Sequence, residues 1–184
     1  MSEDVQVRYA QLADRDTVWP LACDFATTFD LDHDRYNSSF ERRVAEPNTL
    51  LIIAHPPTAE VVRYLLAFSH TTFLANGPVA WVEEVMVAEQ ARRGGIGRRL
   101  IATAEDWSAS IGAAYIALAT RRAAGFHLAL GYTESAAFFR KLTTTTEPGV
   151  RAKGTSGLYG LPRRHLTGLR VSSWHFALVA TDAK

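Results

Sequence analysis

The apolar residues of this chain recur with two periods, one typical of strands and one typical of helices. Residues 5–10 alternate apolar and polar side chains, which predicts a strand with one buried face. The continuous apolar runs at 49–54 and 114–120 predict strands that are buried on both faces. The full set of predicted strands is 5–10, 49–54, 61–74, 79–87, 114–120, 132–142 and 171–180.

Apolar residues three or four positions apart predict helices between these strands. Asp14 is suited to cap the first helix, and Gly112 and Gly131 follow the last apolar positions of two later ones. An acidic turn at 30–34 separates the first two helices. The predicted helices lie within 14–25, 36–45, 94–112 and 123–130.

The order of these elements predicts an α+β fold around a mixed, mostly antiparallel sheet. Asn76-Gly77-Pro78 indicates a hairpin turn between two long strands. Residues 143–170 carry four consecutive threonines, two prolines and several glycines, so we expect a long loop between the last two strands. We find no internal repeat or domain boundary and therefore expect one domain over 1–184.

Composition excludes several classes of function. Hydrophobic residues make up 47% of the chain and charged residues 21%, with a net charge of +1. Bulk electrostatics therefore gives no reason to expect a nucleic-acid or membrane partner. Cys23 is the one cysteine, which excludes an intrachain disulfide, and no histidine or cysteine spacing indicates a metal site. The polar N-terminus and the absence of a long apolar run lead us to expect a cytoplasmic protein of bacterial type.

The most informative segment is a glycine-rich turn at the junction between a predicted strand and a predicted helix. It reads Arg92-Arg93-Gly94-Gly95-Ile96-Gly97-Arg98. Glycines let the backbone approach a ligand, and the unpaired N–H groups at a helix N-terminus attract anions such as pyrophosphate. The third glycine of a dinucleotide-binding turn and the lysine of a P-loop are both missing. A turn with solvent-facing arginines and no ligand is the remaining alternative.

Two motifs resemble the GNAT superfamily of acetyl-CoA-dependent N-acetyltransferases. Arg92-x-x-Gly95-x-Gly97 is similar to that family's acetyl-CoA signature, and 82–87 resembles its fourth strand. Residues 123–132 resemble its later A-x-x-F-Y-x-x-x-G-F segment. The resemblance implies a sheet that is splayed between the fourth and fifth strands, with the pantetheine arm of acetyl-CoA between them.

The same resemblance implies which residues contact the cofactor. The pantetheine amides would pair with the backbone of the fourth strand, and the phosphates would bind at the glycine-rich turn. Thr120 stands where the family often has a cofactor-contacting asparagine, and His127 stands where it commonly has a tyrosine proposed as general acid. The implied cofactor-binding residues are Val85, Met86, Val87, Arg92, Arg93, Gly94, Gly95, Ile96, Gly97, Arg98 and Thr120.

Three residues are candidates for proton transfer. An alkyl ammonium has a pKa of about 10, so its deprotonation near neutral pH needs assistance. Glu83 and Glu84 lie on the strand that would hold the thioester, and a resemblance to polyamine-acetylating relatives favours Glu83. His127 is a candidate acid for the departing thiolate. Solvated side chains without a catalytic role are the alternative for all three.

The acceptor is not identified by the sequence. Phe29 and Asp30 lie in a connection that often borders the acceptor site in this family, and their acidic surroundings suit a cationic amine. A solvated loop without a role is the alternative for this connection. The basic late loop favours an acidic acceptor instead. We expect direct acetyl transfer to a primary amine of a small molecule or peptide, without a metal. A non-catalytic acyl-CoA-binding or regulatory module is the alternative, and the family allows a homodimer.

Overall fold

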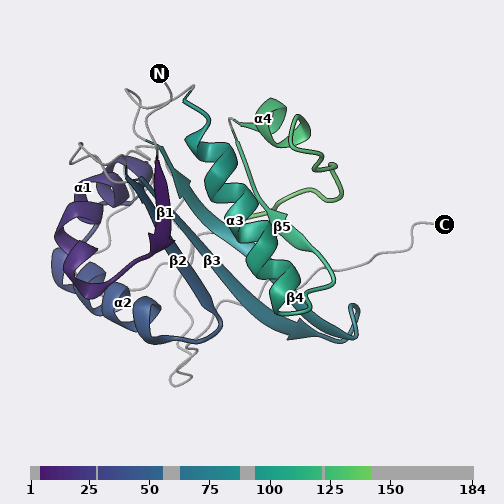
Figure 1. Ribbon diagram of the computed structural model, residues 1–184, viewed down its shortest axis with the longest axis horizontal. Coiled ribbons are helices and arrows are strands. Elements are labelled where there is room, and N and C mark those ends of the chain that lie inside the picture. The colour runs from purple at the N-terminus through teal and green to yellow at the C-terminus, as the bar shows by residue number, and fades with distance from the viewer. Residues whose placement is uncertain (1–4, 28, 56–62, 88–93, 122, 142–184) are drawn as a thin grey trace, which may run out of the picture. The chain divides into compact units, whose positions relative to one another are not determined.

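The computed structural model describes residues 5–27, 29–55, 63–87, 94–121 and 123–141 (Figure 1). These residues belong to the first of two compact units, Met1–Gly154, whereas the second, Thr155–Lys184, lies outside the described residues. The predicted loop at 143–170 and the predicted strand at 171–180 also lie outside them. One domain over 1–184 therefore stays a prediction.

Five strands form a mixed sheet in the order in which they occur along the chain. The first four are antiparallel neighbours, and the fifth lies parallel to the fourth, as the sequence predicted. The strands are β1 (Gln6–Tyr9), β2 (Thr49–His55), β3 (Arg63–Thr72), β4 (Gly77–Met86) and β5 (Ile116–Leu118).

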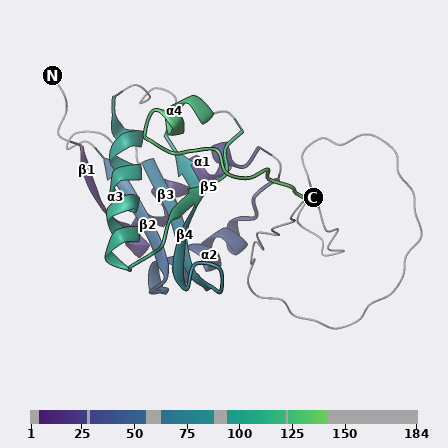
Figure 2. The ribbon, with the colours of Figure 1, turned by 90° about the vertical axis from the view of Figure 1, so that its right-hand side faces the viewer.

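Helices cover both faces of this sheet. Figure 2 shows α3 on one face and the pair α1 and α2 on the other. No helix in the described ranges is long and apolar enough to cross a membrane. The helices are η1 (Leu12–Asp14), α1 (Arg15–Phe25), α2 (His33–Ala45), α3 (Ile96–Ser110) and α4 (Ala124–Leu128).

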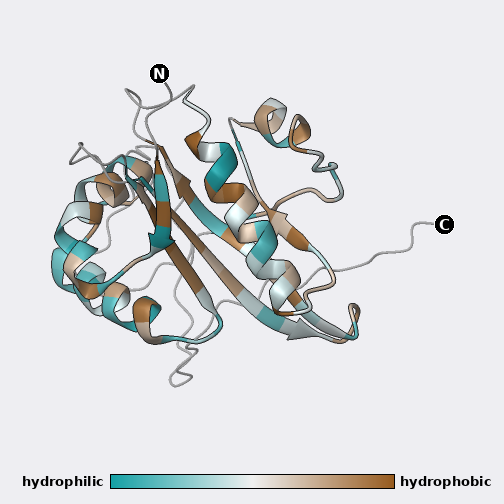
Figure 3. Ribbon diagram, in the orientation of Figure 1, coloured by the Kyte–Doolittle hydropathy of each residue, from teal (hydrophilic) through white to brown (hydrophobic). Residues whose placement is uncertain are grey.

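The sheet separates two hydrophobic cores. Leu50 and Ile52 of β2 point towards α3, whereas Leu51 and Ile53 of the same strand point towards α1 and α2. All four are buried, which explains why β2 is a continuous apolar run instead of an alternating one. Figure 3 shows this hydrophobic character along the central strands.

One predicted strand is wrong within the described residues. Residues 132–141 form no strand, and most of their side chains are exposed. No strand in the described ranges is paired with this segment, so its backbone groups have no ladder partner there. The sequence alone predicted a strand here, but a strand also needs a neighbouring strand to pair with.

Two acidic residues act differently from the simplest prediction. Asp14 occupies the N-cap position of α1, yet its carboxylate accepts hydrogen bonds from Arg8 and from the backbone N–H of Gln11. Asp32, in the predicted acidic turn, caps α2 by accepting from the N–H of Arg35 at 2.9 Å. The second helix consequently begins at His33, three residues before the predicted start.

A β-bulge interrupts the pairing of β3 with β4. Leu66 pairs with Glu84 and the next residue, Ala67, pairs with Val82, so Glu83 is an extra residue on β4. Ala67 and Val82 belong to the core under α3, and Tyr64 and Met86 belong to the core on the opposite face.

The bulge determines which face Glu84 occupies. Without an extra residue, Glu84 would share the face of Val82, because side chains two positions apart point the same way. With it, Glu84 stands opposite Leu66, on the face covered by α1 and α2. The pairing of β5 with β4 also ends at Val82, so β5 pairs with no residue of β4 beyond the bulge.

Deleting Glu83 should be tolerated, because every paired residue of β4 keeps its partner and its face. Deletion of Val82 should not be tolerated, because Glu83 would then occupy the position of Val82, which is only 3% exposed in the core under α3. We expect the free energy of unfolding to change on the order of 1 kcal/mol for the first deletion and to fall by several kcal/mol for the second. Urea denaturation of both variants measures this. The reverse order of stabilities would contradict a bulge at Glu83.

Candidate functional site

A cavity of about 380 Å³ lies on the face of the sheet that carries α1 and α2. Its walls come from both helices, from the segment that joins them, and from the facing side chains of β2, β3 and β4. Phe29 and Asp30, the predicted acceptor-binding residues, line it together with Glu84. The structure therefore brings one predicted catalytic candidate and both predicted acceptor residues to the same cavity.

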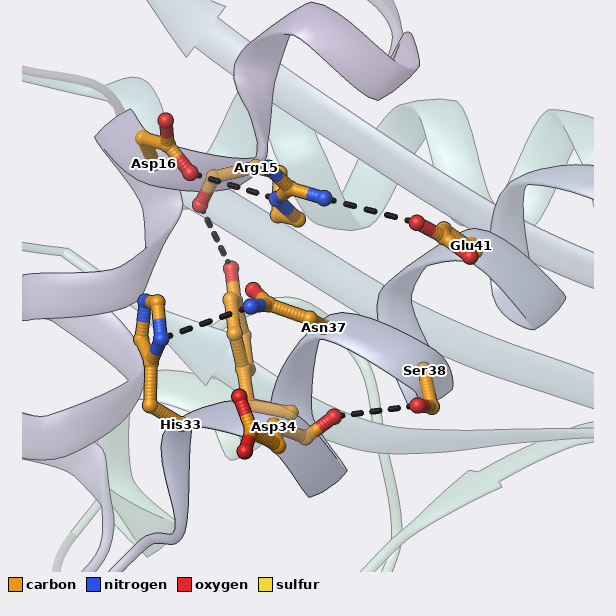
Figure 4. Close-up of polar contacts among 8 residues, drawn as sticks. Arg15, Asp16, His33, Asp34, Asn37, Ser38 and Glu41 are labelled. Atoms are coloured by element: carbon orange, nitrogen blue, oxygen red, sulfur yellow. Dashed lines mark hydrogen bonds and ion pairs between the residues drawn. The ribbon is translucent and has the colours of Figure 1, made fainter.

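Contacts between α1 and α2 hold the helical wall of this cavity. The Tyr36 hydroxyl of α2 donates a hydrogen bond of 2.8 Å to the carbonyl oxygen of Arg15 in α1. Figure 4 shows the Arg15 guanidinium between Asp16 of its own helix and Glu41 of α2, at 3.2 and 3.4 Å. Exposed ion pairs of this kind contribute little stability, so the half-buried tyrosine bond is the stronger constraint.

Glu84 is the carboxylate that the sheet presents to the cavity. The hydroxyl of Tyr64, a buried residue of β3, donates a hydrogen bond of 2.6 Å to its Oε2 atom. Burial raises the pKa of Glu84 above its ordinary value, the Tyr64 hydrogen bond opposes this rise, and the nearby charge of Glu83 adds to it. A carboxylate with a raised pKa is a better proton acceptor than an ordinary one.

Two tyrosines beside Glu84 remain protonated hydrogen-bond donors. Burial first, and then the negative charge of Glu84, raises the pKa of Tyr64 far above its usual range. The pKa of Tyr36 is also raised, by burial, by Asp16 and by Glu84. The sequence analysis did not select either tyrosine. Only knowledge of the bulge would have identified Tyr64 as a partner of Glu84. In a regular strand, Glu84 would lie on the opposite face of the sheet from Tyr64.

Glu83 has different surroundings from Glu84. Its side chain at the bulge is exposed and does not line the cavity. Desolvation still raises its pKa, and a hydrogen bond with Trp81 opposes the rise. The two neighbouring glutamates are therefore distinguished by their position, one in a largely apolar cavity and one in contact with solvent.

The glycine-rich turn begins α3 as predicted. Gly95 is the N-cap and has a φ of 76°, a left-handed conformation that favours glycine. A Cβ atom added to Gly95 would meet open space, whereas one added to Gly97 would lie 3.3 Å from the Phe126 ring and 3.8 Å from Val87. The turn thus packs closely against α4 and the end of β4.

The first turn of α3 is suited to an anion. Hydrogen bonding within the helix begins with the N–H of Arg99, which donates to the carbonyl oxygen of Gly95. The preceding N–H groups, including those of Ile96, Gly97 and Arg98, have no acceptor within the helix by its geometry. Gly94 is exposed beside them, and Arg92 and Arg93 lie outside the described residues.

The arginine that follows the turn has a structural role. The Arg99 guanidinium donates a hydrogen bond of 2.7 Å to the carbonyl oxygen of Val5, which ties α3 to the chain before β1. On β4, Val85 belongs to the core under α3, and Met86 belongs to the core on the cavity face. Neither residue is paired with β5, so this edge of β4 is available for an extended ligand on that side.

His127 and Thr120 do not line the cavity. His127 is 9% exposed, its ring contacts those of Phe126 and Tyr132, and burial lowers its pKa, so the neutral form predominates at neutral pH. The Thr120 Oγ1 atom accepts a hydrogen bond of 3.0 Å from the N–H of Ala123 and turns the chain into α4. Among the described residues, no group of histidine, cysteine, aspartate and glutamate side chains is arranged to hold a metal ion.

Comparison with known proteins gives the family. Residues 15–132 match the model of the "Acetyltransferase (GNAT) family". An "Aminoglycoside N(6')-acetyltransferase type 1" from Acinetobacter genomosp. 13 is 28% identical over 120 residues, which are 60% of this chain and 82% of that protein. A protein of the same description from Serratia marcescens is 34% identical over 82 residues, which are 41% of this chain and 56% of that protein.

Solved structures show the same fold. The glucosamine-6-phosphate N-acetyltransferase from Arabidopsis thaliana has a TM-score of 0.69 at 16% identity, covering 77% of this chain and 100% of that one. An aminoglycoside N-acetyltransferase in complex with CoA has a TM-score of 0.63 at 21% identity, covering 74% and 94%. Since the family model spans more than half of the sequence, this chain is an acyltransferase that belongs to the GNAT acetyltransferase family.

Proposed function

We propose that this protein transfers acetyl from acetyl-CoA to a primary amine of a small molecule or peptide by direct attack, with Glu84 as the base. The observation that carries this proposal is the carboxylate of Glu84 in a cavity at the end of β4, where β4 has no strand partner on the β5 side among the described residues. The curated relatives are described as aminoglycoside acetyltransferases, which supports a small-molecule amine as the acceptor.

The residues of the turn fit the phosphate end of CoA. Gly95 has a left-handed conformation with open space where a side chain would be. Ile96 and Gly97 begin the helix, so their N–H groups point out of its N-terminus, where an anion can accept from them. The arginines at 92, 93 and 98 would add charge for the phosphate oxygens. The backbone of Val85 and Met86 at the end of β4, and of Val87 after it, would pair with the pantetheine amides and direct the thioester towards Glu84.

Glu84 would accept a proton from the acceptor ammonium. Such a group has a pKa of about 10.4, so only a small fraction is neutral at pH 7. Burial makes the Glu84 carboxylate more basic than an exposed one, and Tyr64 holds it in place. Transfer directly or through one water would give the neutral amine that attacks the thioester carbonyl.

We assign the base to Glu84 in preference to Glu83, although the sequence resemblance favoured Glu83. The bulge turns Glu84 into the cavity, whereas Glu83 is exposed to solvent. His127 is neutral and buried away from the cavity lining, so we assign it no proton donation. A thiolate with a pKa of about 8.5, taken as similar to that of cysteine, can leave without an acid. Cytoplasmic location and a homodimer stay predictions from the sequence.

Glu84→Gln should lower kcat/KM by about 10²-fold or more at neutral pH, because the variant lacks the proton acceptor. Glu83→Gln is the matched control and should change kcat/KM by less than about threefold. Thiol release from acetyl-CoA with a panel of primary amines measures both, and the dissociation constant for CoA should be unchanged in each variant. The Glu84→Gln defect should shrink as pH rises. A larger loss in Glu83→Gln would transfer the role to Glu83, and full activity in both would remove it from either.

Glu84 should also make the protein less stable as pH rises. Its pKa is raised in the folded state, so the folded protein binds more protons than the unfolded chain above the ordinary pKa of about 4.3. Stability from this group therefore falls as pH rises through the window between the two pKa values. Glu84→Gln should gain stability relative to the parent as pH rises above about 4, measured by urea denaturation.

Asp14→Asn provides a control of opposite sign. The hydrogen bond from Arg8 is the main cause that lowers the pKa of Asp14, so this residue stabilises the fold at neutral pH and loses that effect as pH falls below about 4. The cost of Asp14→Asn should therefore grow with pH, whereas the benefit of Glu84→Gln grows with pH. Equal pH dependence in parent and Glu84→Gln would contradict the buried carboxylate.

A further inference from the structure

The walls of the Glu84 cavity are mainly apolar, which is unusual for a site that would receive a multiply charged sugar. Side chains from both helices, the connecting segment and the sheet contribute carbon surface. The apolar lining includes Val18, Ala22, Phe25, Leu31, Phe40 and Leu66. Phe25 and Leu31 are 39% and 38% exposed, so they keep contact with solvent at the cavity although they are large and hydrophobic. Such exposure is typical of ligand-binding surfaces.

The polar groups of the cavity are largely engaged within the protein. The Tyr64 hydroxyl donates to Glu84, and the Tyr36 hydroxyl donates to the backbone of α1. The Asp32 carboxylate caps α2, and the Arg43 guanidinium pairs with Glu46 and stacks on a phenylalanine outside the cavity lining. Asp30 and Arg35 also line the cavity, and both interact within the protein. Few partners therefore remain for the hydroxyls of a ligand, and each hydroxyl that is buried without one lowers affinity roughly tenfold.

The size of the cavity agrees with this chemistry. At about 380 Å³ it lies near the lower end of the range for small-molecule sites. This volume is suited to one ring-sized substituent and its amine-bearing arm more than to several linked sugar rings. Glu84 is the acidic group of the sheet wall. Asp30 and Asp32 line the cavity from the connecting segment, where the Asp32 carboxylate caps α2 and Asp30 has other interactions within the protein.

We infer that the acceptor is a monoamine with an apolar, ring-sized body, such as an arylalkylamine, and that the α1–α2 cavity binds this body while Glu84 meets the amine. The inference rests on the proposed function, since it gives the substrate class of the same site. This substrate class differs from the aminoglycosides for which the curated relatives are named.

The test compares acceptors of contrasting chemistry on the parent protein. Thiol release from acetyl-CoA is measured with 2-phenylethylamine, with ethanolamine, and with the aminoglycoside kanamycin. We expect kcat/KM for 2-phenylethylamine to exceed that for the other two by at least about tenfold. A preference for kanamycin or ethanolamine would overturn the inference and leave the acetyltransferase proposal intact.

Binding without turnover distinguishes the remaining outcomes. Calorimetry with 2-phenylethylamine in the presence of CoA measures whether the cavity takes this ligand. Binding without thiol release from any amine would support the ligand class and contradict the proposed function. If 2-phenylethylamine is neither bound nor acetylated, the inference is overturned.

Substitutions at the cavity mouth assign the effect to these walls. Phe25→Ser and Leu31→Ser should each raise KM for 2-phenylethylamine about tenfold and change KM for ethanolamine by less than about twofold, because only the first substrate uses the apolar wall. Both residues are partly exposed, so the fold should tolerate the change. Leu12→Ser is the matched control, since Leu12 is 57% exposed and lies outside the cavity lining. Equal effects of all three substitutions, or equal effects on both amines, would contradict the assignment.

Discussion

The single extra residue in β4 is the constraint on which the candidate site depends. Because Glu83 has no partner on β3, the strand changes register between Val82 and Glu84. Ala80 and Val82, before the bulge, belong to the core under α3, whereas Glu84, after it, lies on the opposite face of the sheet. The pairing of β5 ends at the same point, so the bulge and the unpaired edge of β4 coincide. A regular strand would bury a carboxylate under α3 and leave the sheet wall of the α1–α2 cavity without an acidic group.

This arrangement has an energetic cost that a purely structural site would avoid. The partly buried Glu84 has one strong hydrogen-bond donor, Tyr64, and desolvation raises its pKa in spite of that bond. An ionised carboxylate in such surroundings is less stable than the same group in water, and its proton affinity is correspondingly greater. The property that weakens the fold is therefore the property that a general base needs. Exposed Glu83, one residue away, has neither the position nor the same degree of burial.

Much of the fold followed from local patterns, but the orientation of the site did not. The apolar run of β2 and the periodic face of α3 identified buried elements because each pattern depends only on neighbouring residues. Gly95 at the start of α3 likewise followed from a conformation that favours glycine. The bulge depends on the register between two strands, which no local pattern contains. The strand wrongly predicted over 132–141 has the same origin, since pairing in a sheet is a property of two segments.

The most direct test of this account is a crystal structure with a bisubstrate ligand, in which the sulfur of CoA is joined through an acetyl linker to the nitrogen of 2-phenylethylamine. The account predicts the phosphates at Gly95 to Arg98, the aromatic ring in the α1–α2 cavity, and the ligand nitrogen about 3 Å from Glu84 or joined to it by one water. A ring outside the cavity, with the nitrogen directed towards Glu83 or the α3 face, would contradict it.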